Sequence, residues 1–220
     1  MTAEHATLAK AGLLDQFGDL DIYLFAQLLH GRIRPGMRIL DVGCGAGRNL
    51  VYLLRAGYDV SAVDISADAV AATRQLAAAI APLVPDENFR VESADALSFD
   101  DERFDVVISS AVLHFARDAA DFDAMLDGMW RVLRPGGLLF ARLASTIGLP
   151  LAQFTPLGNG RFRMPDGSDR YVVDEAALMA GTARLGGCLA DPLKTTVVQH
   201  ARCMTTWVLR KQLAASRTTR

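Results

Sequence analysis

The chain has 220 residues, of which 51% are hydrophobic and 22% are charged, and its formal net charge is −2. This length and composition are typical of one folded globular domain and exclude a disordered chain. Because 23 Lys and Arg are balanced by 25 Asp and Glu, we expect no nucleic-acid partner.

Hydropathy and cysteine usage indicate in which cellular compartment the protein is found. No apolar run reaches the length of about 18 residues that a membrane span needs, and no apolar signal segment follows the N-terminus. The three cysteines, Cys44, Cys188 and Cys203, include no CxxC pair. We therefore expect a cytoplasmic protein with free thiols, no membrane partner and no bound metal.

A strand that runs into a glycine-rich turn dominates the first part of the chain. After a helix that begins at Asp19 or Asp21, the buried-strand pattern Arg38–Val42 leads into Gly43, Gly45 and Gly47. Glycine permits positive φ and close backbone approach to a ligand, and free N–H groups at a helix start favour polar or anionic groups. The stretch predicts the nucleotide-facing first turn of an α/β sheet.

Strand and helix patterns then alternate to residue 143. This alternation predicts right-handed crossovers and an open, doubly wound α/β sheet. The expected helices are Asn49–Ala56, Ala67–Ala81 and Phe122–Leu133, and the expected strands are Asp59–Val63, Phe89–Glu92, Phe104–Ser109 and Leu138–Leu143.

The last third of the chain begins with an interruption. Residues 144–172 are rich in Gly and Pro and predict a long loop, which is uncommon unless it is functional or disordered. A helix is expected over Asp174–Leu185. Strands over Lys194–Gln199 and Cys203–Leu209 predict an antiparallel hairpin at the sheet edge.

The glycine turn alone leaves two cofactor classes open. A dinucleotide fold requires G-x-G-x-x-G and an acid about twenty residues later. Here the glycines alternate, Asp41 precedes them, and Asp64 ends the second strand. Since either cofactor class can use an acid at Asp64 to bind ribose hydroxyls, the choice depends on later segments.

Those later segments carry a family resemblance. Asp95 closes the third strand, and the segments Phe104–Phe115 and Leu133–Gly137 follow in order. From Arg38 to Leu143 the chain resembles the class I S-adenosylmethionine-dependent methyltransferases. The resemblance implies a Rossmann-like seven-stranded sheet of order 3-2-1-4-5-7-6 with strand seven antiparallel. It also implies S-adenosylmethionine as cofactor and S-adenosylhomocysteine as product.

The resemblance assigns cofactor-binding roles along the strand ends. Asp41 and the turn backbone would meet the methionine part, Asp64 the ribose, and Ile65 one face of the adenine. Asp95 would accept from the adenine amine. The full implied set is Asp41, Gly43, Gly45, Asp64, Ile65, Asp95, Ala96, Ser110 and Ala111.

A narrower likeness concerns the methyl acceptor. Gly47–Asn49 and the closing Thr206–Lys211 resemble the tellurite-resistance branch and related thiopurine-type small-molecule enzymes. This implies a soft thiol or metalloid acceptor, which needs little help beyond alignment. The alternatives are an oxygen or nitrogen acceptor that uses His114 as general base, and a cofactor-binding regulatory or scaffold protein without turnover.

Candidate acceptor-side residues come from four places. His114, after the fourth strand, and His200, at the terminal hairpin turn, are the candidate catalytic bases. The acceptor-binding candidates are aromatic residues near the N-terminus and arginines of the long loop, whose forked donors suit an anion. They are Phe17, Tyr23, Arg161, Arg163 and Arg170.

We therefore expect one methyltransferase domain over residues 1–220, acting as a monomer or homodimer on a small molecule. Its expected parts are an N-terminal cap over 1–36, a cofactor-binding core over 37–143, the long loop over 144–172 as a possible acceptor lid, and a last helix and hairpin over 173–220.

Overall fold

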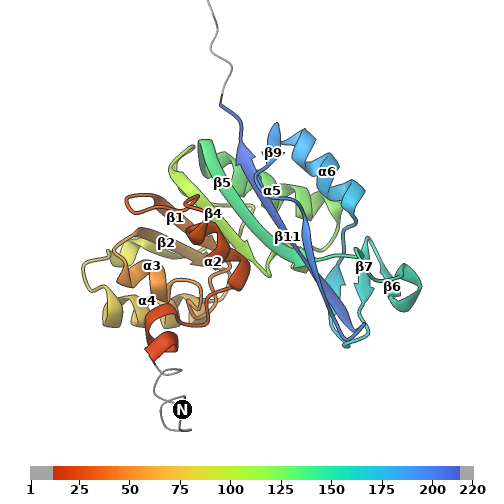
Figure 1. Cartoon of the computed structure of the whole chain (residues 1–220), viewed down its shortest axis with the longest axis horizontal. Coiled ribbons are helices and arrows are strands. Elements are labelled where there is room, and N and C mark those ends of the chain that lie inside the picture. Colours follow the sequence, from red (N-terminus) through yellow and green to blue (C-terminus); the bar gives the residue numbers. More distant parts are fainter. Residues whose placement is uncertain (1–11, 214–220) are drawn as a thin grey trace, which may run out of the picture. The chain divides into compact units, whose positions relative to one another are not determined.

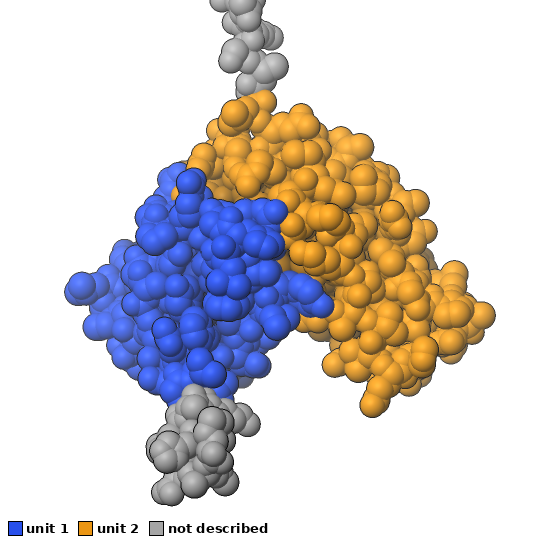
Figure 2. All heavy atoms as spheres, in the orientation of Figure 1, with its two compact units in different colours: residues 1–93 blue, residues 94–220 orange. Residues whose placement is uncertain are grey.

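The computed structural model describes residues 12–213, and the outermost residues of the predicted segments 1–36 and 173–220 lie outside that range. Two compact units divide the chain, residues 1–93 and residues 94–220 (Figure 2).

The first unit is built on parallel strands. Strand β2 pairs with β1 on one side and with β3 on the other, both in parallel (Figure 1). Ile39, Leu40 and Val60 are fully buried, as expected for parallel strands that are covered on both faces. The elements are α2 (Ile22–Leu29), β1 (Arg38–Val42), α3 (Val51–Arg55), β2 (Asp59–Asp64), α4 (Ala67–Ile80), the 3-10 helix η1 (Asp86–Asn88) and β3 (Phe89–Val91).

Side-chain caps begin α2 and α4 but not α3. At the start of α4, Ser66 accepts from the backbone N–H of Ala69. Helix α3 starts at Val51 and not at the predicted Asn49. The Oδ1 atom of Asn49 instead accepts from the backbone N–H of Asp21, 3.1 Å away, and so joins the glycine turn to the start of α2.

The second unit continues the sheet pattern with mixed strand directions. Strand β4 is parallel to β5, and β11 runs antiparallel to both β5 and β10. The strand order is β3-β2-β1 in the first unit and β4-β5-β11-β10 in the second. Strand β11 corresponds to the predicted strand seven and β10 to strand six, so the predicted strand order is confirmed. The main elements are β4 (Phe104–Ser110), η2 (Leu113–Phe115), α5 (Ala119–Val132), β5 (Leu133–Ala144), α6 (Glu175–Arg184), β10 (Lys194–Val198) and β11 (Arg202–Lys211).

Three local predictions in this unit need correction. Helix α5 begins at Ala119 and not at Phe122, because the side chain of Asp118 caps it. Strand β5 begins at Leu133 and not at the predicted Leu138, and its pairing with β4 shifts register between Phe104 and Val106. A short strand that the sequence did not predict, β9 (Gly187–Leu189), pairs with the end of β11.

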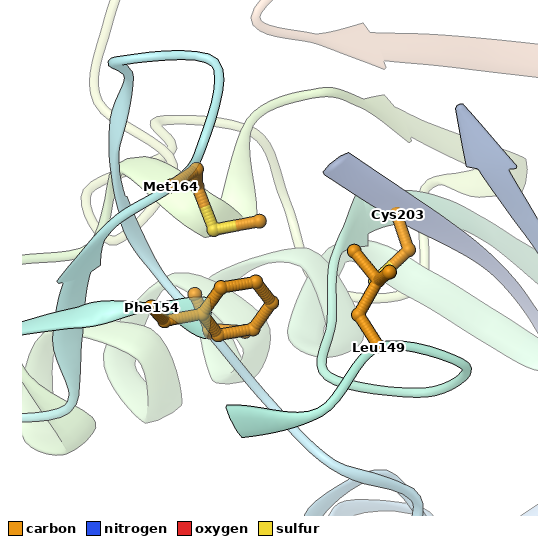
Figure 3. Packing of buried hydrophobic residues seen from close by; sticks show 5 residues of the cluster. Leu149, Phe154, Met164 and Cys203 are labelled. Carbon is orange, nitrogen blue, oxygen red and sulfur yellow. The ribbon is translucent and has the colours of Figure 1, made fainter. Parts of the chain in front are cut away.

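The prediction of a long loop over 144–172 is wrong. After the 3-10 helix η3 (Leu151–Gln153), strands β6 (Thr155–Gly158), β7 (Arg161–Arg163) and β8 (Asp169–Tyr171) form a three-stranded antiparallel sheet. Buried apolar residues among the glycines and prolines hold this small sheet in place. The cluster, drawn as sticks in Figure 3, consists of Leu149, Phe154, Met164, Val172 and Cys203.

Candidate active site

The glycine turn after β1 is tied to the neighbouring strand. The N–H groups of Gly43 and Cys44 donate to the carbonyl of Val63 across 2.8 Å and 3.0 Å. Gly47 has φ +79°, and a Cβ there would lie 2.7 Å from Leu76 of α4. The positive φ and this close approach to α4 both favour glycine at this position.

Asp64 organises the turn from the end of β2. Its Oδ2 accepts from the N–H of Gly45 and its Oδ1 from the N–H of Ser66, each at 2.9 Å. The carboxylate thus joins the glycine turn to the start of α4 and keeps lone pairs for ribose hydroxyls. The next side chain, Ile65, is 77% exposed and fits the predicted role of an apolar face for a base.

Asp41 is a buried acid, and one of its carboxyl oxygens has no hydrogen-bond partner among the described residues. Its side chain is 1% exposed, and its Oδ2 has no partner among the described residues. Burial raises the pKa of Asp41 to about 7, while Arg48 acts to lower it and Asp64 to raise it. A cationic donor is the group that would satisfy this oxygen, so the site fits the ammonium that the family resemblance places there.

In the second unit, α5 holds the loop that carries Asp95 and Ala96. Both residues are exposed. Arg131 donates to the carbonyls of Phe99 and Leu97 across 2.8 Å and 2.5 Å. Gly128 lies so close that an added Cβ would overlap the carbonyl oxygen of Ala94. These contacts fix the backbone of the predicted adenine-binding loop.

The end of β4 turns sharply at Ala111. Ser110 is buried, and Ala111 adopts φ +66°, a left-handed conformation that is costly for a residue with a Cβ. The N–H of Ala111 donates to the carbonyl of Arg142 in β5 across 2.8 Å. Residues held in such conformations often lie at functional sites.

His114, in η2, is buried and has a defined tautomer. Its Nδ1 lies 3.2 Å from the backbone nitrogen of Ala144, whose N–H must donate. Burial first, and then the charge of Arg170, lower the pKa of His114 to about 4. At neutral pH the ring is uncharged and its proton must lie on Nε2. It can donate a hydrogen bond from Nε2, but it has no free lone pair with which to act as a base.

A cavity of about 270 Å³ opens beside His114 within the second unit. We call it the acceptor cavity. It contains three of the residues predicted from sequence, namely Ala111, His114 and Arg170, together with two further arginines from β5 and β11. The lining residues are Ala111, His114, Phe115, Arg142, Ala144, Met164, Asp166, Ser168, Arg170, Val198, Arg202, Cys203 and Met204.

Arg170 links the small sheet to η2. Its guanidinium lies 4.7 Å from the ring centroid of Phe115, whose ring in turn lies 4.7 Å from that of His114. Such cation–π geometry holds a guanidinium in place. The Nη1 atom of Arg170 also donates to the carbonyl of Asp169 across 2.8 Å. Arg170 is therefore a positioned cation at the cavity wall.

The remaining acceptor-side candidates lie away from this cavity's lining. His200 is exposed at the β10–β11 turn with φ +56°. Arg163 forms a forked ion pair with Asp169 at 2.8 Å and 3.1 Å on the small sheet. Arg161 is partly buried in β7.

The two aromatic candidates belong to the first unit. The ring of Phe17 stacks on Tyr52 at 5.4 Å and meets Phe25 edge-on at 5.3 Å. Tyr23 lies in the first turn of α2, where its backbone N–H donates to Asp21. Phe17 thus has a packing role within its own unit.

Arg142 and Arg202 were not predicted. A signal existed for Arg142, which is charged within the otherwise apolar run of β5. Across residues 12–213 no group of His, Cys, Asp and Glu has the arrangement of a metal site. No helix in the same range is both long and apolar enough to cross a membrane.

Comparison with known proteins agrees with this geometry. A family profile described as "Methyltransferase domain" matches residues 40–141. The ubiquinone biosynthesis O-methyltransferase of Chelativorans sp. (strain BNC1) is 32% identical over 171 residues, which cover 72% of this chain and 64% of that relative. The chain therefore spans less than two thirds of that relative's length.

Solved structures share the fold. A SAM-dependent methyltransferase from Methanosarcina mazei is 25% identical with a TM-score of 0.67, covering 85% of this chain and 98% of that one. The magnesium protoporphyrin IX methyltransferase of Synechocystis PCC 6803, solved with bound SAM, is 20% identical with a TM-score of 0.63, covering 86% and 77%. The matches agree with the strand order described above.

Proposed function

The chain belongs to the class I S-adenosylmethionine-dependent methyltransferases through the domain that residues 40–141 form, and from this premise we propose that it methylates a small molecule bound in the acceptor cavity. One observation supports the proposal. Ala111, in a left-handed conformation at the end of β4, lines that cavity and also belongs to the predicted cofactor-binding set, so the same residue would contact both cofactor and acceptor.

S-adenosylmethionine, the cofactor of this family, supplies a methyl group on a sulfonium sulfur. In this chain the buried carboxyl of Asp41 would hold its ammonium, and Asp64 its ribose hydroxyls. The exposed side chain of Ile65 and the loop at Asp95 and Ala96 would receive its adenine. The Oδ2 of Asp41, which has no partner among the described residues, supports the part of this assignment that concerns the ammonium.

The protein's own contribution is alignment and exclusion of water. The leaving group of a sulfonium is already activated, so a reaction of this kind depends chiefly on holding the two reacting centres in line. The Nε2–H of His114 would orient the acceptor by donating to it. The tautomer of His114 does not support the general-base role that the sequence suggested.

The acceptor atom is therefore one that reacts without a protein base. A thiolate or reduced metalloid meets this condition, and so does the anion of an acidic hydroxyl. The name of the Chelativorans relative, an O-methyltransferase, supports oxygen over the softer atoms. An acceptor panel of phenols, thiols, amines, selenite and tellurite would identify the atom.

Two measurements test the proposal. Calorimetry should show binding of S-adenosylmethionine, weakened about tenfold or more in Asp64→Asn, since each 1.4 kcal/mol of lost interaction is a factor of ten. Asp68→Asn, a nearby acid in the first turn of α4, is the matched control and should bind like the wild type. Formation of S-adenosylhomocysteine from the acceptor panel then tests turnover.

The result that would overturn the proposal is a folded protein that binds the cofactor but forms no S-adenosylhomocysteine with any member of the panel. That outcome would favour a regulatory or scaffold protein without turnover. If a folded sample did not bind the cofactor, both the methyltransferase and the cofactor-binding scaffold protein would be excluded.

A further inference from the structure

We propose that the ligand of the acceptor cavity is a small organic acid, bound as its anion by the guanidinium groups of Arg170 and Arg202. This inference rests on the proposed function, because the ligand is a methyl acceptor only if the protein is a methyltransferase. The binding preference itself can be measured without turnover.

The charge of the cavity lining supports an anion. The described lining residues include three cations, Arg142, Arg170 and Arg202, and one carboxylate, Asp166. Arginine presents forked donors that match the geometry of a carboxylate. The lining therefore carries more positive than negative charge, which favours an anionic ligand over a neutral one.

Asp166, a single carboxylate, offsets only part of that charge. Its Oδ1 accepts from both the backbone N–H and the hydroxyl of Ser168, at 3.0 Å and 2.6 Å. Burial acts to raise the pKa of Asp166, but the bonds from Ser168 and the charges of Arg202 and Arg170 lower it overall. The residue therefore stays ionised and fixed to its own hairpin.

The lining also lacks a group that would remove a proton from a neutral acceptor. Among its described members, His114 carries its proton on Nε2, and Asp166 is a weak base because its pKa is lowered. Burial raises the pKa of Cys203, so this residue stays a thiol. An acceptor that arrives already ionised removes the need for a base.

Size and apolar contacts define the rest of the ligand. Ligand pockets usually measure about 300–1,000 Å³, so a cavity of about 270 Å³ suits a molecule with a single ring. Phe115, Met164 and Met204 supply apolar and polarisable wall atoms beside the arginines. A compact aromatic or short aliphatic acid meets these conditions.

The transfer step balances for such an acceptor. When the reacting atom is itself ionised, as a carboxylate oxygen or a thiolate sulfur of the acid is, it would form a bond to the methyl carbon while the bond from that carbon to the sulfonium sulfur breaks. The electron pair of the broken bond would stay on sulfur, which would become a neutral thioether. No proton has to leave during this step.

The test compares each acid with its neutral amide in the full chain saturated with S-adenosylhomocysteine. The probes are 4-hydroxybenzoate against 4-hydroxybenzamide, and 4-mercaptobenzoate against 4-mercaptobenzamide, measured by calorimetry. We expect the wild type to bind each acid about tenfold more tightly than its amide, as charge-assisted hydrogen bonds allow. Raising the salt concentration should weaken acid binding and leave amide binding unchanged.

Variants then assign the preference to the arginines. Arg170→Gln and Arg202→Gln should each reduce it to about twofold, whereas Arg170→Lys, which keeps the charge but loses the fork, should give an intermediate value. Arg163→Gln is the matched control, because Arg163 lies on the same small sheet and pairs with Asp169. If Arg170→Gln does not fold, Arg202→Gln and the salt dependence still decide.

The inference is overturned if the wild type binds amides as tightly as acids, if it binds none of the acids, or if Arg163→Gln abolishes the preference as Arg202→Gln does. Failure here is distinct from failure of the proposed function. Turnover of neutral acceptors without acid preference would retain the function and reject the inference. Acid binding without any turnover would retain the inference and reject the proposed function.

Discussion

The Nδ1 atom of His114 accepts a hydrogen bond from the backbone N–H of Ala144 across 3.2 Å, and this bond determines where the neutral imidazole carries its proton. His114 follows β4, and Ala144 is the last residue of β5. The bond therefore ties the segment after one strand to the end of the neighbouring strand, at the wall of the acceptor cavity. A base role for His114 would require this bond to break.

The pH dependence of the free energy of unfolding should reveal the hydrogen bond between His114 and Ala144. Because protonation of His114 is disfavoured in the native state, with a pKa of about 4 against 6.5 for the free side chain, the unfolded chain binds the extra proton first. The free energy of unfolding should fall as pH falls from about 6.5 to about 4. His114→Asn, whose Oδ1 can accept from Ala144, should lose this part of the pH dependence.

Urea unfolding of the wild type and His114→Asn between pH 7.5 and 4 measures the difference. His114→Ala should be less stable than His114→Asn by about 1–3 kcal/mol at pH 7.5, because it leaves the N–H of Ala144 buried without its acceptor. Equal stability of the two variants would contradict the hydrogen bond, and identical pH profiles for the wild type and His114→Asn would contradict the lowered pKa.

Asp41 should couple cofactor binding to pH in the opposite direction. Its carboxyl is protonated below a native pKa of about 7 and charged above it, so affinity for a cationic ammonium should rise as pH passes through 7. Asp41→Asn should remove this rise and weaken binding of S-adenosylmethionine about tenfold at pH 7.5. Calorimetry from pH 6 to 7.5, below the pKa of about 7.7–8.0 usual for an α-amino group, measures both effects.

The same variant gives a check that does not use the cofactor. Above pH 7 the wild type pays for a buried charge that Asp41→Asn lacks, so the variant should be more stable at pH 8, by about 1–4 kcal/mol. At pH 5, where the native carboxyl is protonated, the gain should shrink. A variant that is less stable than the wild type at pH 8 would show that Asp41 has a partner in solution.

Local patterns predicted the first unit and the outer strands well, because their signals lie within short stretches. The apolar run of β1, the glycine turn and the acid at the end of β2 are adjacent in sequence, and they fold as predicted. The hairpin of β10 and β11 likewise depends on neighbouring residues.

The acceptor cavity could not be predicted in the same way. Arg142 and Arg202 both line it because β5 and β11 pair in a register that sets Met204 opposite Ala144. Nothing near either arginine in sequence indicates that pairing. The small sheet was missed for a related reason: its buried residues Phe154 and Met164 lie just outside its strands, among glycines and prolines, where no strand-like alternation is visible.

Gly128 should be indispensable for the loop that carries Asp95. A Cβ at this position of α5 would overlap the carbonyl oxygen of Ala94, which cannot move without shifting the loop. Gly128→Ala should lower the free energy of unfolding by about 2–3 kcal/mol and weaken cofactor binding. Gly12→Ala is the control, since nothing lies within 4 Å of a Cβ there. Thermal unfolding of the two variants would contradict the prediction if their midpoints were equal.

Ala111 should carry strain that glycine relieves. An L-residue at φ +66° costs about 1–2 kcal/mol, whereas glycine adopts this region freely but loses more chain entropy on folding. We expect Ala111→Gly to be more stable than the wild type by about 0.5–1 kcal/mol in urea unfolding. Ala116→Gly, at φ −51° and buried only a few residues away, should instead be less stable. If both variants were destabilised alike, the left-handed conformation at the edge of the acceptor cavity would not be the native one.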